Sequence, residues 1–382
     1  MDRREFLRKA GIGAAGVAGA TLLAACDDGT GAQATTGDTD LDEALTASDL
    51  PEVSWRLAAS WPTNLDTIFG GATTFADRVR AMTGGKFDID ARAAGELVPA
   101  LEILQSVQSG AVECGHTASY YYTGLAEWVA FGTAVPFGLT ARQQNGWWYY
   151  GGGEELMQGL YADNFNAIQF LAGNTGTQMG GWFNVEIQSL ADLQGLRMRI
   201  PGLGGRVMER LGVTVQQIAG GEIFQSLQTG AIDAAEWVGP YDDTILEFQT
   251  VTDFYYYPGW WEPGPSLEVQ IGMDHWNDLP EEYQEVVRTA AAQANVDMMA
   301  SYDHKNPVAF QELLDGGDVE VLPFPDDVMQ AAEEEAFALY DENASGDPDF
   351  QSVLDSWKPY RDAVNSWFKI AEAGMINYEP QV

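Results

Sequence analysis

A twelve-residue segment occurs twice in the chain, and this repeat constrains the fold more than any other feature. The segment "EILQSVQSGAVE" occupies residues 102–113 and "EIFQSLQTGAID" occupies residues 222–233, with seven identical positions and no gap. In each copy, apolar residues recur at helical spacing before a glycine, and a short strand follows. The repeat therefore predicts two lobes of one design, offset by 120 residues.

Strands and helices alternate around both copies of the repeat. The strand "FDIDARA" precedes the first copy, and "LRMRIP", "GGRVMERLG" and "VTVQQI" precede the second. This alternation is typical of an α/β fold with mostly parallel sheets, in which ligands bind beyond the carboxyl ends of the strands. We expect a cleft between lobe I, residues 51–176 and 262–300, and lobe II, residues 177–261 and 301–382, which includes long C-terminal helices.

The N-terminus predicts export. Arg3 and Arg4 precede the apolar stretch "AGIGAAGVAGATLLAA", which is typical of a Tat-type signal over residues 1–25. The stretch ends in "LLAAC", which resembles a lipobox with Cys26 as the lipidated residue, and Asp27 favours retention on the inner membrane. Residues 26–50 are acidic and poor in large apolar residues, so we expect a flexible spacer. The alternative is an uncleaved N-terminal anchor, which also leaves the lobes outside the cytoplasm.

The net charge argues against nucleic-acid binding, and the cysteine content argues against an internal disulfide. The formal net charge is -38, and residues 1–25 contribute +2, so the remaining chain carries -40. Such a chain is not expected to bind nucleic acid. Only Cys114 remains once Cys26 is lipidated, so we expect no internal disulfide.

One carboxylate lies in an apolar run that reads as a buried strand. In "GAIDAAEWVG", residues 230–239, Glu236 lies between an alanine pair and Trp237. A charge in such a run is costly unless it is paired or bound to a cation, so Glu236 indicates a site. The alternative is a structural pair with an arginine elsewhere in the core. The repeat aligns Glu236 with His116, so "TASYYYTG" should face the same cleft.

Four motifs resemble those of a known family: "GNTGTQMGGWF", "GLRMRIPGLGGRVMERLG", "GGEIFQSLQTGAIDAAEWVGPYDD" and "YYYPGWWEPG". Together they resemble the extracytoplasmic solute-binding subunit of a TRAP transporter, over nearly the whole chain from Glu52. Within that family the chain resembles the branch that binds 2-oxo and 2-hydroxy monocarboxylates with a metal ion. The resemblance implies a two-lobe periplasmic-binding-protein fold of type II, with mixed sheets flanked by helices. It also implies small and large TRAP membrane subunits as partners, and no enzymatic activity.

The same resemblance assigns the site residues. Arg199 would pair with the carboxylate of a small organic acid, such as pyruvate or lactate. The side chains of Gln178 and Glu236 and the backbone carbonyl of Trp237 would hold the cation. Oxygen ligands suit a hard ion, Na⁺ or Ca²⁺. Further substrate-binding residues are expected in the pocket wall, with the Tyr122 hydroxyl reaching the substrate: Asn174, Tyr121, Tyr122 and Trp182.

Three alternatives stay open. An exported metal-dependent enzyme that acts on a carboxylate would use the same kind of cleft, but it needs a base beside the cation. A ligand sensor would differ from a transport protein only in its partner. The amphipathic C-terminal helices could also form a homodimer.

Overall fold

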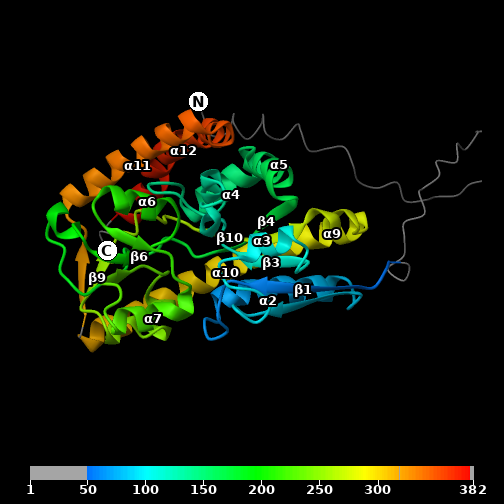
Figure 1. Cartoon of the computed structure of the whole chain (residues 1–382), viewed down its shortest axis with the longest axis horizontal. Helices are drawn as coiled ribbons and strands as arrows, with labels where there is room; N and C mark the ends of the chain where they lie inside the picture. Colours follow the sequence, from blue (N-terminus) through cyan, green and yellow to red (C-terminus); the bar gives the residue numbers. More distant parts are fainter. Residues whose placement is uncertain (1–49, 318, 379–382) are drawn as a thin grey trace, which may run out of the picture. The chain divides into compact units, whose positions relative to one another are not determined.

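Two β-sheets organise the part of the chain that the computed structural model describes, residues 50–317 and 319–378 (Figure 1). The strand order is β2-β1-β3-β10-β4 in the first sheet and β11-β9-β5-β8-β6-β7 in the second. The first sheet contains β1 (Val53–Ala59), β2 (Phe87–Arg92), β3 (Cys114–Thr117), β4 (Ala167–Asn174) and β10 (Ser266–Gly272). The second contains β5 (Trp182–Phe183), β6 (Arg197–Arg199), β7 (Thr214–Gln216), β8 (Ala234–Ala235), β9 (Phe254–Tyr257) and β11 (Glu320–Pro323).

Helices connect and cover these strands. The α-helices are α2 (Ile68–Met82), α3 (Ile103–Gln108), α4 (Ala141–Tyr150), α5 (Gly153–Phe165), α6 (Gly202–Arg210), α7 (Gly220–Gln228), α8 (Pro240–Ile245), α9 (Met273–Asn277), α10 (Glu281–Gly316), α11 (Asp326–Gly346) and α12 (Pro348–Ile376). The 3₁₀ helices are η1 (Ser119–Tyr122), η2 (Glu127–Gly132), η3 (Leu190–Leu193) and η4 (Phe248–Thr250). Within the described residues, no helix combines the length and the hydropathy that a membrane span requires.

Both sheets are mixed, as expected, and each contains one strand that runs against its neighbours. In the first sheet β10 is antiparallel to β3 and β4, and in the second β5 is antiparallel to β8 and β9. The remaining pairs are parallel. The chain passes from the first sheet to the second between β4 and β5, and returns between β9 and β10. The antiparallel strand is the first strand after each of these two passages, whereas β11, which the chain reaches through α10, is parallel to β9.

The sequence repeat has the same place in both sheets. Helix α3 leads into β3, which pairs with parallel β1 and antiparallel β10. Helix α7 leads into β8, which pairs with parallel β6 and antiparallel β5. His116 lies in β3 and Glu236 directly follows β8. The expected equivalence of these two positions is therefore confirmed.

The passages from β4 to β5 and from β9 to β10 lie side by side and are joined by backbone hydrogen bonds. We call residues 174–181 and 258–266 the hinge segments. The amide of Gln178 donates to the carbonyl of Glu262 at 3.2 Å, and that of Gly259 donates to the Gln178 carbonyl at 3.1 Å. The amide of Thr175 donates to the Pro265 carbonyl at 3.0 Å. Side chains on these segments are thus held at the junction of the two sheets.

The C-terminal helices α10, α11 and α12 pack against strands and helices of both sheet layers. Helix α10 packs against α2 and β4, and also against α8 (Figure 1). Helix α11 packs against α6, whereas α12 packs against α4, α5 and η2. Hydrogen bonds hold α12 there, including one from Trp147 Nε1 to Ser356 Oγ at 3.1 Å. The prediction that residues 301–382 belong with lobe II therefore needs a correction for α12, whose apolar face packs on the helices that follow the first lobe's strands.

Gly181 allows a hinge segment to pass close to β8. Its φ is +81°, and a Cβ there would lie 2.6 Å from the carbonyl oxygen of Ala235. We expect Gly181→Ala to lower the free energy of unfolding by about 1–3 kcal/mol, because it adds both backbone strain and a steric clash. Urea denaturation measures this change. Gly70→Ala in α2, where a Cβ meets no atom within 4 Å, is the control and should not destabilise; equal losses in both variants would contradict the assignment.

Candidate functional site

A buried ion pair lies where two parallel strands of the second sheet end. Arg199 is the last residue of β6, Glu236 follows β8, and the amide of Glu236 donates to the Arg199 carbonyl at 3.2 Å. The guanidinium donates from Nη1 to Oε1 and the carbonyl of Glu236, and from Nε to the Ile218 carbonyl at 2.9 Å. Both side chains are buried. Glu236 is therefore paired with an arginine, and that arginine is the one expected to bind the substrate carboxylate.

Each partner of this pair keeps one polar atom without a hydrogen bond. Nη2 of Arg199 and Oε2 of Glu236 are both buried and unpartnered. Gln178 Oε1, on the first hinge segment, is buried and unpartnered as well. The other end of this amide group is held by a hydrogen bond from Nε2 to Thr175 Oγ1 at 3.2 Å. Buried polar atoms without partners are rare and cost free energy. One free donor and two free oxygens fit an anion together with a cation.

A small void beside Gln178 has a largely aromatic wall. Its volume is about 10 Å³, which is room for about one water molecule and not for an organic acid. The lining residues lie on segments next to the first sheet, on the segment that follows β8 and on the first hinge segment: Trp61, Ile68, Tyr120, Tyr121, Thr175, Gln178, Trp237, Val238 and Leu267. Ligand entry therefore requires these walls to separate.

His116 does not line the void, but it positions Trp61, which does. Trp61 Nε1 donates to His116 Nδ1 at 2.7 Å, and His116 Nε2 donates to the Ala172 carbonyl at 3.1 Å. Burial lowers the pKa of His116 to about 4, so the ring stays neutral. The Trp61 N–H is engaged by its hydrogen bond to His116, so Trp61 lines the void with its ring. The centroid of this ring lies 6.0 Å from that of Tyr121 and 6.2 Å from that of Trp237.

The structure brings together only part of the residues expected to bind substrate. Tyr121 lines the void with Gln178 and Trp237. The Tyr122 hydroxyl instead shares a hydrogen bond with Thr117 Oγ1 at 2.7 Å. Two others are also turned to structural partners: Trp182 stacks on Tyr255 with centroids 3.9 Å apart, and Asn174 Nδ2 donates to the Gly264 carbonyl at 3.2 Å and to Ser266 Oγ at 3.1 Å. Asn174, Tyr122 and Trp182 are not among the residues that line the void.

Six lining residues were not among the predicted site residues: Trp61, Ile68, Tyr120, Thr175, Val238 and Leu267. Trp61 lies just beyond the carboxyl end of β1, which is where ligands bind in such sheets, so its position was a usable signal. Tyr120 belongs to a run of three tyrosines in η1. The sequence alone could not tell which of the three rings faces the void.

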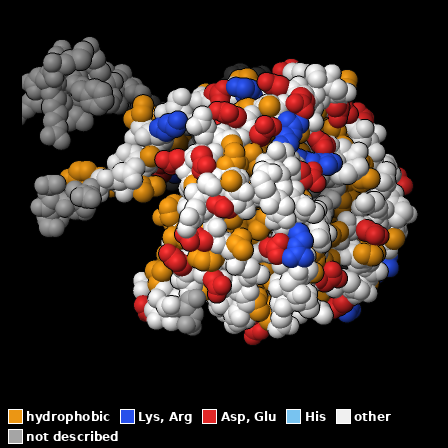
Figure 2. Space-filling view, turned by 60° about the vertical axis from the view of Figure 1, so that its left-hand side comes forward, with side chains coloured by type: hydrophobic (Ala, Val, Ile, Leu, Met, Phe, Trp, Pro, Cys, Tyr) orange, Lys and Arg blue, Asp and Glu red, His pale blue; other side chains and the backbone are white. Residues whose placement is uncertain are grey.

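Burial raises the pKa of two carboxyl groups near Arg199, those of Glu236 and Glu262. It raises the pKa of Glu236 to about 7, although the charge of Arg199 acts in the opposite direction. Burial, together with the charge of Glu236, also raises the pKa of Glu262 well above its usual range, again against Arg199. A cation between these groups would lower both values, because it favours the ionised forms. Among the charged side chains on the visible face, Asp and Glu are more frequent than Lys and Arg (Figure 2), so positive charge for an anion must be supplied locally.

The available donors fit a hard cation. Gln178 offers an amide oxygen and Glu236 a carboxylate oxygen, both buried and without a partner. Nowhere in residues 50–317 and 319–378 do three or more His, Cys, Asp or Glu side chains gather around a possible metal position. Oxygen donors of this kind suit Na⁺ or Ca²⁺, whereas zinc and copper prefer nitrogen and sulfur.

Asp243 orders the backbone that follows Glu236. Its Oδ1 accepts from the amides of Val238 and Gly239 at 3.2 and 3.1 Å. Its Oδ2 accepts from Trp182 Nε1 at 2.9 Å and from the Tyr255 hydroxyl at 2.8 Å. The indole N–H of Trp182, which was predicted as a ligand contact, is thus engaged by Asp243.

We expect Asp243→Asn to lower the free energy of unfolding by about 2–4 kcal/mol, since an amide NH₂ would face donors that then lack an acceptor. Urea denaturation followed by tryptophan fluorescence measures the loss. The exposed Asp253→Asn is the control. If both variants unfold at the wild-type urea concentration, Asp243 does not hold this segment.

Comparison with known proteins agrees with this geometry. Residues 57–347 match the model of the family described as bacterial extracellular solute-binding protein, family 7. The chain is 50% identical over 378 residues to the monocarboxylate 2-oxoacid-binding periplasmic protein of Nostoc sp., covering 99% of each chain.

Solved structures show the same fold. A TRAP transporter solute-binding protein from Bordetella bronchiseptica, with calcium and picolinate in one of its sites, has a TM-score of 0.84 and 43% identity, covering 86% of this chain and 97% of that one. A TRAP periplasmic solute-binding protein from Pseudoalteromonas atlantica, with bound sodium and pyruvate, has a TM-score of 0.82 and 38% identity, covering 86% of this chain and 100% of that one. The chain belongs to family 7 of the bacterial extracellular solute-binding proteins, the solute-binding subunits of TRAP transporters.

Proposed function

We propose that this protein captures a short 2-oxo or 2-hydroxy monocarboxylate, such as pyruvate or lactate, together with Na⁺ or Ca²⁺. It then delivers the acid to the small and large membrane subunits of a TRAP transporter. The observation that carries the proposal is the set of three buried, unpartnered atoms, Arg199 Nη2, Gln178 Oε1 and Glu236 Oε2. The binding of pyruvate with sodium or calcium by related proteins supports the choice of ligand.

Each residue has a separate role in this proposal. Arg199 donates to the carboxylate of the acid while Glu236 keeps the guanidinium oriented. The oxygens of Gln178 and Glu236 and the carbonyl of Trp237 hold the cation, which would supply positive charge for the oxygen on C2. Trp61, Tyr120 and Tyr121 enclose the short apolar part of the acid and exclude water.

Contacts at the rim support capture by closure of the lobes. The Tyr241 hydroxyl in α8 donates to Asp66 Oδ1, which precedes α2, at 3.0 Å. Lys305 Nζ in α10 donates to Asp66 Oδ2 at 2.9 Å. Gln217 Nε2, after β7, donates to the Tyr121 carbonyl at 3.1 Å. These bonds stabilise the closed arrangement, and the hinge segments are the backbone that would bend when the lobes separate.

Isothermal titration tests the proposal. After chelation, the protein is titrated with pyruvate, lactate and a longer 2-oxo acid, each with and without Na⁺ or Ca²⁺. We expect binding that requires a cation, a loss of at least about 100-fold for Arg199→Ala, which removes the carboxylate's partner, and a weaker cation dependence for Glu236→Gln.

Arg197→Ala is the matched control, because Arg197 lies on the same strand but pairs with Asp233 at 2.5 Å and is partly exposed. This variant should bind like the wild type once circular dichroism shows that all variants fold. Unchanged affinity and cation dependence in Glu236→Gln would show that the cation assignment is wrong.

The rival proposals need other observations. An enzyme would need a base beside the cation; His116 has both ring nitrogens engaged, and the free oxygen of Glu236 is the one assigned to the cation. We therefore propose binding without chemistry, and product analysis after long incubation with pyruvate tests it. A sensor would use the same cleft, and a neighbouring kinase gene instead of two membrane-protein genes would favour it.

We also propose Tat-type export and a lipid anchor on Cys26, which lies outside the described residues. The twin arginines and the sequence "LLAAC" support both steps. Mass spectrometry of protein extracted from the membrane tests the modification.

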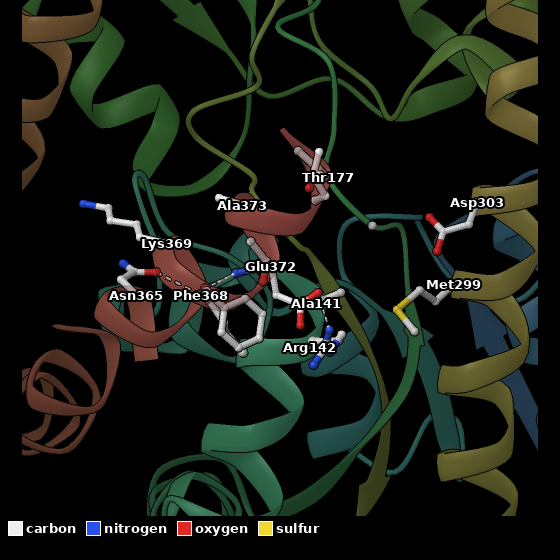
Figure 3. A pocket seen from close by; sticks show the side chains of 14 residues that line it. Ala141, Arg142, Thr177, Met299, Asp303, Asn365, Phe368, Lys369, Glu372 and Ala373 are labelled. Atoms are coloured by element: carbon white, nitrogen blue, oxygen red, sulfur yellow. Dashed lines mark hydrogen bonds and ion pairs between the residues drawn. The ribbon is translucent and has the colours of Figure 1, made fainter. Parts of the chain in front are cut away.

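We further propose a homodimer through the end of α12. Four large apolar side chains there are exposed, namely Trp367 at 61%, Ile370 at 76%, Met375 at 74% and Ile376 at 79%. The same end of α12 borders a groove of about 580 Å³ with the start of α4 and with Met299 of α10 (Figure 3). Light scattering of the purified protein, with Trp367→Ser as the comparison, tests this interface.

A further inference from the structure

The wall of the void has an aliphatic corner, formed by Ile68 and Leu267, to which the function proposed above gives no role. Ile68 in α2 and Leu267 in β10 line the void and are 2% and 1% exposed. The free polar atoms belong to Arg199, Glu236 and Gln178 instead. An acid whose carboxylate and C2 oxygen engage those atoms has only its alkyl end left to place against the aliphatic corner.

Met298 in α10 lies behind this corner and is 2% exposed. A Cβ at Gly173 in β4 would lie 2.6 Å from Met298 Cε and 3.2 Å from Leu267 Cβ, so both side chains are neighbours of the same glycine. A Cβ at Gly71, on the same face of α2 as Ile68, would lie 2.3 Å from the same methyl group. The two glycines therefore leave the space that the end of the Met298 side chain fills.

Two other walls of the void are fixed more firmly than this corner. Trp61 Nε1 donates to His116 Nδ1 at 2.7 Å, which holds the Trp61 ring. The Trp237 ring packs so closely on Gly220 that a Cβ there would lie 2.3 Å from it. A methionine side chain, in contrast, is unbranched and adapts to irregular space. Room for a longer alkyl group is therefore made most easily at the aliphatic corner, by displacement of Met298.

We propose that Met298 determines the length of the acid that the site accepts. It acts by supporting the aliphatic corner, so it is a positioning residue and not a ligand contact. Pyruvate ends in one methyl group and makes the smallest demand on the corner, whereas each further methylene presses on the packed methionine. The inference deepens the proposed function and rests on it, because it takes the carboxylate to lie at Arg199.

The test is calorimetry of the wild type and Met298→Ala with pyruvate, 2-oxobutanoate and 2-oxopentanoate, in the presence of Na⁺ and Ca²⁺. We expect the wild type to bind pyruvate most tightly. In Met298→Ala, the affinity for a longer acid relative to pyruvate should rise about fourfold for each additional methylene, because each one is then buried without displacing a side chain. Met298→Leu, which has a similar volume, should keep the wild-type order.

Met157→Ala is the matched control. Met157 in α5 is also fully buried, but it is not among the atoms nearest to Gly71 or Gly173. This variant loses core packing as well, yet it should keep the wild-type ratio of affinities, because a general loss of stability does not distinguish acids by length. If Met298→Ala does not fold, Leu267→Ala, which shortens the corner itself, is read in the same way.

The outcomes separate this inference from the proposed function. If the wild type binds pyruvate, an unchanged ratio in folded Met298→Ala overturns the role of Met298 and leaves the proposed function intact. An equal change in Met157→Ala, or a wild type that binds the longer acids as tightly as pyruvate, has the same meaning. If the wild type binds none of the three acids, the proposed function is wrong and the inference is overturned with it.

Discussion

The buried pair of Arg199 and Glu236 is the interaction on which the rest of the site depends. An arginine and a glutamate of this kind are costly to bury, and their attraction offsets that cost only when their remaining polar atoms find partners. In this structure each keeps one unpartnered atom, and Gln178 adds a third. A ligand that carries both a negative group and a cation satisfies all of them at once, which links stability of the closed state to the presence of that ligand.

The fold explains why these groups meet. Both sheets have the same arrangement around the repeated helix and strand, so the carboxyl ends of β3 and β8 are equivalent positions. In the first lobe this position holds His116, which orients Trp61. In the second lobe it leads to Glu236. The first lobe therefore contributes Trp61, Tyr120 and Tyr121 to the aromatic wall, and the second contributes Trp237 and the ion pair, while the hinge segments contribute Gln178 and Glu262.

Much of this was predictable from the sequence, and the failures have physical causes. The repeat and the alternation of elements predicted two α/β lobes, and the motifs predicted Arg199, Gln178 and Glu236. The structure pairs Arg199 with Glu236 and places Gln178 beside Trp237 in the wall of the void. The sequence could not show which tyrosine of η1 faces the void, because neighbouring residues in a 3₁₀ helix differ only by rotation about its axis. It also could not show that α12 packs back against the first lobe's helices, because an amphipathic pattern identifies an apolar face and not its partner.

A crystal structure of the protein grown with Ca²⁺ and pyruvate would test the account most directly. We expect one ion at about 2.3–2.6 Å from Gln178 Oε1, Glu236 Oε2 and the carbonyl oxygen of Trp237. We also expect the pyruvate carboxylate within hydrogen-bond distance of Arg199 Nη2. An ion bound elsewhere, or pyruvate bound without contact to Arg199, would contradict this assignment.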